Sequence, residues 1–324
     1  MIKKNTREKI MNYEFDFYDK TNLKSYNLNE TMRYQLNMLD SLDTFTRKHC
    51  ENVASLTCRL CEHLHCNKNF TEYCTICAYL HDIGKLFIPS KILQKPNKLT
   101  QEEFETMKTH TTLGYKMCMK DLKLRPYAAG ALYHHEALNG SGYPQGLTKK
   151  DIPYEGQIIR VADEYDAIVS KRQYKSHVGI SDTLKILIEN TKPEQVVKKS
   201  DALHAMAEET RLGKNNALIV RTLFKVVIED IEYEISCIAS YVEDLEKELK
   251  RLKQIEKYQE KKQNAKKEKD QNYYLEGIKM LLKKEETLDN YTSFYEEYKK
   301  AYQTRKDIID NLYKEIKIIK KLKV

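Results

Sequence analysis

Two short clusters of imidazole and carboxylate side chains stand out in this sequence. The first is the adjacent pair His81 and Asp82, which ends an apolar run and has Lys85 three residues further on. The second is the adjacent pair His134 and His135. Neutral imidazole and carboxylate groups are the ligands of borderline divalent metals such as Fe, Mn, Ni and Zn. We interpret the clusters as two parts of one metal site that folding brings together.

Seven side chains in total are candidate metal ligands. They are His49, His81, Asp82, His110, His134, His135 and Asp163. A single histidine is more often structural than a ligand, but adjacent ionisable pairs are unfavourable in a core unless both members find partners. Seven ligands exceed the needs of one ion, so we expect two ions that share the Asp82 carboxylate. The first ion would also take His49, His81 and Asp163, and the second His110, His134 and His135.

Hydrolysis of a phosphodiester is the chemistry that such a centre favours. Two ions held roughly 3.5–4 Å apart can place a bridging hydroxide in line with phosphorus. Lys85 follows Asp82 by one helical turn, so we expect its cation to steady the phosphate or the departing oxygen. The alternative for Lys85 is an ordinary surface lysine. The predicted catalytic residues are therefore Asp82 and Lys85.

The elements that must position these side chains are helices. Apolar residues recur at spacings of three and four, and no strand pattern of any strength appears, which predicts an all-α protein. A capping box at Thr100 and Glu103 predicts a helix start, and the Gly- and Pro-rich segment 137–156 predicts an ordered loop. Ligands near helix ends can converge on one cavity in a helical bundle. The expected helices span about 47–64, 73–82, 101–110, 126–135 and 158–168.

A heptad pattern replaces this arrangement in the C-terminal part of the chain. Apolar residues hold the a and d positions from Ile228 to Leu252, and recur at every seventh residue from Leu281 to Ile316. A Lys-rich polar run, 259–272, separates the two segments. This pattern predicts either an antiparallel helical hairpin or one long helix that dimerises.

Composition excludes several classes of protein. The 324 residues are 41% hydrophobic and 32% charged, with a net charge of +8 and a mean hydropathy of -0.69. These values fit a soluble protein, and no window approaches the roughly 18 apolar residues that span a bilayer. The charged N-terminus has no apolar signal core, so we expect a cytoplasmic protein. The Lys excess of the C-terminal part is interpreted as a solvated helix face, not as a nucleic-acid-binding patch.

The eight cysteines include two pairs with zinc-like spacing, Cys58 with Cys61 and Cys74 with Cys77. Both pairs lie in helical patterns among apolar residues and lack the Gly or Pro turn of a zinc knuckle. We therefore expect buried core cysteines, which behave as small hydrophobic side chains, instead of a structural zinc site. Without an export signal, a disulfide framework is not expected either.

Residues 40–225 resemble the HD-GYP domain, a branch of the metal-dependent HD phosphohydrolases. The matching motifs run in family order and at family spacing over more than half of the chain. They are DTFTRKH (43–49), LHDIGKLFIP (80–89), ILQKPNKLT (92–100), His110, HHE (134–136), GSGYP (140–144), ADEYDA (162–167) and RQY (172–174).

The resemblance implies an HD-type helical bundle that hydrolyses cyclic di-GMP to pGpG, GMP or both. It supports the ligand set above, with Fe or Mn as the expected ions and Ni or Zn as alternatives. It also implies that Gly142, Tyr143, Pro144, Arg172 and Tyr174 line the nucleotide site. Arginine can fork onto phosphate, and glycine lets backbone approach a ligand.

Departures from the family pattern affect the metal count and the substrate. Family members with a third metal carry a Glu four residues before the first His, where this chain has Phe45, so the resemblance implies a binuclear site. Asn139 replaces an Asp that is common in the GYP loop. The alternatives are therefore a phosphodiesterase for another cyclic dinucleotide or nucleotide phosphate, or a non-catalytic nucleotide-sensing scaffold.

The expected domain organisation combines the two patterns. Residues 1–39 form a polar lead-in, 40–227 the HD-GYP catalytic domain, and 228–324 a coiled-coil helical region. The expected partner is a cyclic dinucleotide, with a homodimer or a protein partner docking through the coiled coil. Neither nucleic acid nor a membrane is an expected partner.

Overall fold

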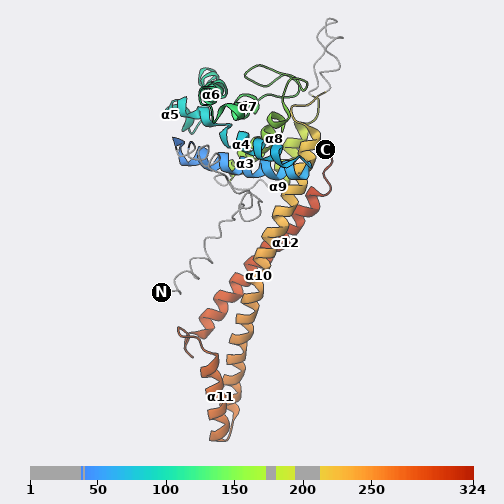
Figure 1. Cartoon of the computed structure of the whole chain (residues 1–324). Helices are drawn as coiled ribbons and strands as arrows, with labels where there is room; N and C mark the ends of the chain where they lie inside the picture. The colour runs from blue at the N-terminus through green and yellow to red at the C-terminus, as the bar shows by residue number, and fades with distance from the viewer. Residues whose placement is uncertain (1–37, 39–40, 173–179, 194–211) are drawn as a thin grey trace. The chain divides into compact units, whose positions relative to one another are not determined.

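The computed structural model describes residues 38, 41–172, 180–193 and 212–324 (Figure 1). The chain divides into two compact units, the first reaching Val227 and including the last four residues, the second covering Ile228–Lys320. Every named element of the described residues is a helix, which confirms the expected all-α fold. The predicted lead-in lies outside the described residues, except for Met38.

The first unit is a bundle of helices on an apolar core. α3 packs against α4 and α8, and α6 packs against η4 and α7. Fully buried side chains fill the space between them, among them Leu60, Leu80, Ile83, Ile158 and Ile159. The elements are α3 (Thr44–His63), α4 (Lys68–Leu80), η4 (Ile83–Phe87), α5 (Ser90–Leu93), α6 (Gln101–Lys120), η5 (Arg125–Tyr127), α7 (Ala128–Tyr133), α8 (Tyr154–Arg172), α9 (Ile180–Glu189) and the start of α10 (Ala217–Asn264).

Side-chain caps fix where these helices begin. The Asp43 carboxylate accepts a hydrogen bond from Thr46 N at 3.0 Å and starts α3. Thr100 and Glu103 form the predicted capping box at the start of α6. This helix continues past its expected end at His110 to Lys120, because no proline interrupts the chain there.

The four cysteines with zinc-like spacing are buried and carry free thiols. Burial raises the pKa of the Cys58 thiol to about 12, which keeps it protonated. Within the described part of the chain, the side-chain groups that could hold a metal do not include these cysteines. This environment agrees with their interpretation as core residues.

The second unit contains the rest of α10, α11 (Glu268–Leu281) and α12 (Tyr291–Ile319). All three helices contribute to one apolar cluster, in which Leu252, Ile255, Ile278 and Tyr291 are buried. In Figure 1, α12 runs along α10, and Tyr302 Oη donates to Glu246 Oε1 at 2.7 Å between them. The heptad segments thus pack against each other within one chain, while a coiled coil and a dimer stay predictions.

The polar connector is shorter than the sequence pattern indicates. α10 continues to Asn264 and α11 starts at Glu268, because the Lys, Glu and Gln residues of segment 259–272 have good helix propensity. The second heptad series is instead interrupted between α11 and α12, where Leu288 is exposed. Among the described helices, none combines the length and the apolar character that crossing a membrane requires.

A forked ion pair fixes the connection between α11 and α12. Arg251 Nη1 and Nη2 donate to the two carboxylate oxygens of Glu286, each at 2.6 Å. Arg251 Nη1 also donates to the carbonyl of Leu281 at 2.6 Å. Burial favours the neutral acid of Glu286, but the Arg251 hydrogen bonds outweigh burial and lower its pKa. One guanidinium on α10 therefore holds both the end of α11 and the following loop.

Replacing Glu286 with Ala is expected to destabilise the α11–α12 connection by about 2–3 kcal/mol, because a largely buried guanidinium loses one of its two carboxylate partners. Amide hydrogen exchange in α11 and α12 of the full chain measures this local opening. The matched control is Asp244→Ala, which removes the exposed pair with Lys247 and should change stability by no more than about 0.5 kcal/mol. Equal exchange in the two variants would contradict the role of the fork.

Candidate metal centre

The seven predicted ligands converge in the first unit from distant parts of the chain. α3 supplies the first histidine, the end of α4 supplies the His-Asp pair, and α6 supplies one more histidine. The adjacent histidine pair follows α7, and α8 supplies the second aspartate. The His-Asp pair and the histidine pair follow helix ends, as the sequence pattern predicts, whereas His110 and Asp163 lie in the middle of α6 and α8. The residues are His49, His81, Asp82, His110, His134, His135 and Asp163.

Asp82 lies at the centre of this group and is buried. Its Oδ2 atom is 3.6 Å from His49 Nε2 and 3.3 Å from His81 Nε2. Its Oδ1 atom is 3.4 Å from His110 Nε2 and 3.9 Å from His134 Nε2. The two oxygens of one carboxylate thus face two different sets of imidazoles, which is the geometry that a bridging ligand needs.

Asp163 also faces both sets. Its Oδ1 atom is 3.0 Å from His49 Nε2 and 4.0 Å from His81 Nε2. Its Oδ2 atom is 3.8 Å from His135 Nδ1. The sequence analysis assigned this carboxylate to the first ion alone, whereas the structure places it between the two sets.

Backbone carbonyl groups orient three of the imidazoles. The Nδ1 atoms of His81, His110 and His134 each donate a hydrogen bond, which leaves the Nε2 lone pairs for the centre. The acceptors are the carbonyl oxygens of Ala78, Met107 and Gly130, at 2.6, 2.7 and 2.9 Å. All three acceptors precede their histidine by three or four residues, so helical geometry itself sets these ring orientations.

At His49 a carboxylate, in place of a backbone carbonyl group, orients the imidazole. Asp166 Oδ2 lies 2.7 Å from His49 Nδ1, and Asp166 Oδ1 accepts from Asn52 at 3.1 Å. The sequence analysis did not assign Asp166 to the site. Its position three residues after Asp163 on α8 was the available signal, because residues i and i+3 share a helix face.

Buried atoms without partners show that the donor set fits metal ions. His81 Nε2 and Asp82 Oδ1 are both buried and make no hydrogen bond. Buried polar atoms in folded proteins nearly always have a partner. Here the unpartnered atoms point at the shared centre and are the atoms that a divalent cation coordinates. The ligand types and their arrangement therefore fit divalent metal ions.

Electrostatics keep most of the set in its metal-binding protonation state. Burial lowers the pKa of His110 and His134, and it lowers the pKa of His135 to about 3. These imidazoles are neutral at pH 7. Burial alone would raise the pKa of Asp82 and of Asp163, but Lys85 and His49 respectively hold both carboxylates ionised.

His49 differs from the other imidazoles. Burial would lower its pKa, but the hydrogen bonds with Asp163 and Asp166 raise it to about 10. A metal ion at this position would therefore displace the proton on Nε2. Metal binding that releases a proton becomes weaker as the pH falls.

Lys85 stands beside the centre in η4. Its Nζ donates to Asp82 Oδ2. Burial would lower its pKa, but the Asp82 charge raises it, so Lys85 remains a cation.

The residue before Lys85 is Gly84, where an added Cβ would lie 1.9 Å from the carbonyl oxygen of His110. Only glycine lets η4 approach α6 this closely.

The loop that carries Gly142, Tyr143 and Pro144 lies against the second set of ligands. The Tyr143 ring centre is 4.6 Å from that of His135, and Tyr143 N donates to the His135 carbonyl at 3.2 Å. A Cβ on Gly142 would lie 2.3 Å from Ala137 N. The loop therefore folds back onto the histidine pair. Arg172 is the last residue of α8, but its side chain is not among the described parts of the structure, and Tyr174 lies outside the described residues. The roles of both therefore stay predictions.

Glu136 fixes this loop, a role that the sequence analysis did not assign. Its buried carboxylate accepts from Gln145 N at 2.7 Å and from Leu147 N at 2.9 Å. The adjacent position of Glu136 and His135 ties the loop to a proposed ligand. The sequence could not show this, because the partners are backbone groups nine and eleven residues away.

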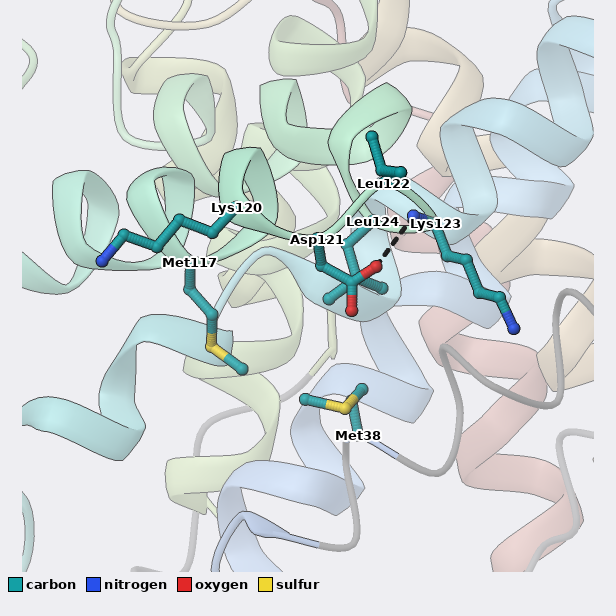
Figure 2. Close-up of a pocket in the computed structure, with 7 residues that line it drawn as sticks. All are labelled: Met38, Met117, Lys120, Asp121, Leu122, Lys123 and Leu124. Carbon is teal, nitrogen blue, oxygen red and sulfur yellow. Dashed lines mark hydrogen bonds between the residues drawn. The ribbon is translucent and has the colours of Figure 1, made fainter.

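Two pockets of the first unit differ in their relation to the centre. Figure 2 shows one of about 560 Å³, and none of the seven proposed ligands lines it. Its lining residues are Met38, Met117, Lys120, Asp121, Leu122, Lys123 and Leu124. The other, of about 270 Å³, has Lys85 in its wall and so adjoins the centre.

Comparisons with known proteins show the family to which the chain belongs. A family model described as HD domain matches residues 33–195. The "Cyclic di-GMP phosphodiesterase" of Thermotoga maritima is 46% identical over 144 residues, 44% of this chain and 39% of that protein. The "Cyclic di-GMP phosphodiesterase response regulator RpfG" of Xanthomonas campestris is 36% identical over 148 residues, 45% of this chain and 39% of that protein.

A third relative has a different named substrate. The "3'3'-cGAMP-specific phosphodiesterase 1" of Vibrio cholerae is 32% identical over 151 residues, 47% of this chain and 35% of that protein. The chain thus spans between 35% and 39% of the length of these three relatives. The residues that the family model matches lie in the first unit.

Replacing Asp82 with Ala is expected to remove the shared ligand and reduce metal content from two ions per chain to less than one. Mass spectrometry of metal content after loading with Mn²⁺ and gel filtration measures this. The control is Asp182→Ala, which removes an exposed carboxylate of α9 and should leave metal content unchanged. Full occupancy in the Asp82 variant would rule out the bridging role.

Replacing Glu136 with Ala is expected to release the loop, because two backbone N–H groups lose their acceptor. Hydrogen exchange at Gln145 and Leu147 should accelerate about tenfold to a hundredfold. The control is Asp151→Ala, which removes a carboxylate of the same segment that accepts from the Thr148 side chain. Unchanged exchange at both amides would contradict the role of Glu136.

Proposed function

Because this chain belongs to the HD domain family, and within it to the HD-GYP branch, we propose that it is a metal-dependent phosphodiesterase that hydrolyses cyclic di-GMP to pGpG, GMP or both. The observation that carries the proposal is the arrangement around Asp82. Each of its oxygens faces a separate group of imidazole nitrogens, and buried His81 Nε2 and Asp82 Oδ1 have no protein partner. Two relatives named cyclic di-GMP phosphodiesterases support the choice of substrate.

The proposed centre is binuclear. His49 and His81 would hold the first ion, and His110, His134 and His135 the second, with both aspartates between them. We propose Fe or Mn, with Ni or Zn as alternatives that suit the same ligands. When bound, the two ions would supply an acidified water and charge neutralisation at a phosphodiester.

The chain's own residues orient the reacting groups. Lys85 stays cationic and lies beside the Asp82 carboxylate, where it can neutralise charge that develops on a phosphate or on the departing oxygen. Tyr143 lies over His135 and forms one wall of the approach. Gly142 and Pro144 shape the same loop, and we propose that the loop contacts the nucleotide, together with Arg172 and Tyr174.

In a second candidate function the metal centre is the same, but the substrate is a cyclic dinucleotide with a different base. The Vibrio cholerae relative that is named as specific for 3'3'-cGAMP supports it. The scaffold alternative has less support, because a protein that only binds nucleotide needs no such ligand set. The cytoplasmic location, and a dimer or protein partner at the second unit, are further parts of the proposal.

Incubating the metal-loaded full chain with cyclic di-GMP, cyclic di-AMP and 3'3'-cGAMP tests the function directly. Chromatography of the products should show pGpG or GMP from cyclic di-GMP at the highest kcat/KM. Release of product from 3'3'-cGAMP alone would favour the second candidate. No product from any of the three, with two ions bound, would refute a phosphodiesterase of cyclic dinucleotides.

Replacing Lys85 with Ala is expected to lower kcat about 10²- to 10³-fold while metal content stays the same, because a cation at the reacting phosphate is lost. Lys91→Ala is the matched control, since Lys91 is an exposed lysine of the neighbouring α5. An unchanged kcat in the Lys85 variant would identify it as a surface lysine.

A further inference from the structure

The pocket that adjoins the metal centre has an aromatic wall. Its volume is about 270 Å³, and parts of α3, η4 and α6 and the end of α5 enclose it. Most of the wall is apolar, with polar groups from one carboxylate, one hydroxyl, one amide and one ammonium. The lining residues are Asp43, Phe45, Thr46, Lys85, Leu93, Gln94 and Met107.

Phe45 is the exposed part of this wall. It lies in the first turn of α3, and 62% of its surface is accessible. The ring is therefore not part of the core, although it lies only four residues before His49. A phenyl group has no ligand atom and cannot add a third metal at this position. Its flat face remains available to another molecule.

Lys85 connects the pocket to the metal centre. Its ammonium group donates to Asp82 Oδ2, and the same side chain lines the pocket. A phosphate held at the centre would therefore place its nearest substituent at the pocket entrance. In a nucleotide this substituent is a ribose that carries a base, so a base lies one sugar away from the reacting phosphate.

We propose that the pocket is a nucleobase subsite in which one purine of the cyclic dinucleotide stacks on Phe45. This assignment rests on the proposed function. Leu93 and Met107 provide the remaining apolar surface, and the Gln94 amide provides a donor and an acceptor for the edge of the base. Stacking of a base on an aromatic side chain contributes about 1–3 kcal/mol, and it accepts either purine because each has a π face.

Removing the ring should weaken binding without unfolding α3. Asp43 caps the helix by accepting hydrogen bonds from Thr46 N and Thr46 Oγ1, and neither bond involves the Phe45 side chain. Phe45→Ala should raise the dissociation constant about 5- to 150-fold, the range that the stacking magnitude predicts. Phe45→Tyr keeps the ring face and should bind nearly as well as the original chain. A merely structural role of Phe45 would not separate these two variants in affinity.

The sequence contains no tryptophan, so Phe45→Trp creates a single reporter at the proposed stacking face. The full chain is loaded with Zn²⁺, whose filled d shell does not absorb, and titrated with a phosphorothioate analogue of cyclic di-GMP that resists hydrolysis. Guanine stacked on indole quenches its emission. Phe87→Trp is the matched control, because Phe87 is 54% exposed in η4 and does not line the pocket.

Equilibrium dialysis of the same samples measures how much analogue is bound. The expected result is quenching in Phe45→Trp that follows occupancy, with unchanged emission in Phe87→Trp. Binding with unchanged emission, or equal affinity of Phe45→Ala and the original chain, would overturn the subsite and leave the proposed function intact. No binding to the original chain would overturn the subsite and the proposed substrate together.

Discussion

The buried carboxylate of Asp82 is the group on which the rest of the first unit depends. An isolated charge in this position would be strongly unfavourable, so the surrounding residues must compensate it. Lys85 contributes a cation, and imidazoles from three other elements face its two oxygens. The bundle therefore places groups from several elements around one buried carboxylate.

Close backbone contact makes the convergence possible. Gly84 lets the turn that follows Asp82 pack directly on α6, next to His110. Gly142 lets the loop after the histidine pair fold back on the chain at Ala137. In both places a side chain would occupy the space of a backbone atom. The glycines thus set how near the two sets of ligands and the covering loop can lie.

The sequence predicted much of the fold, and the side chains that the fold brings together at Asp82, for local reasons. Adjacent pairs such as His81 with Asp82, and the capping box at Thr100, need only neighbouring residues to be recognised. What it missed depends on distant partners. Asp166 orients a histidine 117 positions away, and the Glu136 carboxylate binds backbone groups that carry no sequence signal. Leu288 fits the heptad by spacing, but the chain is not helical there. The buried Tyr291 ring and the Arg251–Glu286 ion pair fix the connection between α11 and α12 instead.

The proton on His49 makes the two halves of the centre unequal. The imidazoles of the second set are already neutral, whereas His49 has a pKa of about 10 and must lose a proton before its nitrogen can bind a metal ion. Metal binding at His49 would then release a proton to the solvent, whereas binding at the imidazoles of the second set would not.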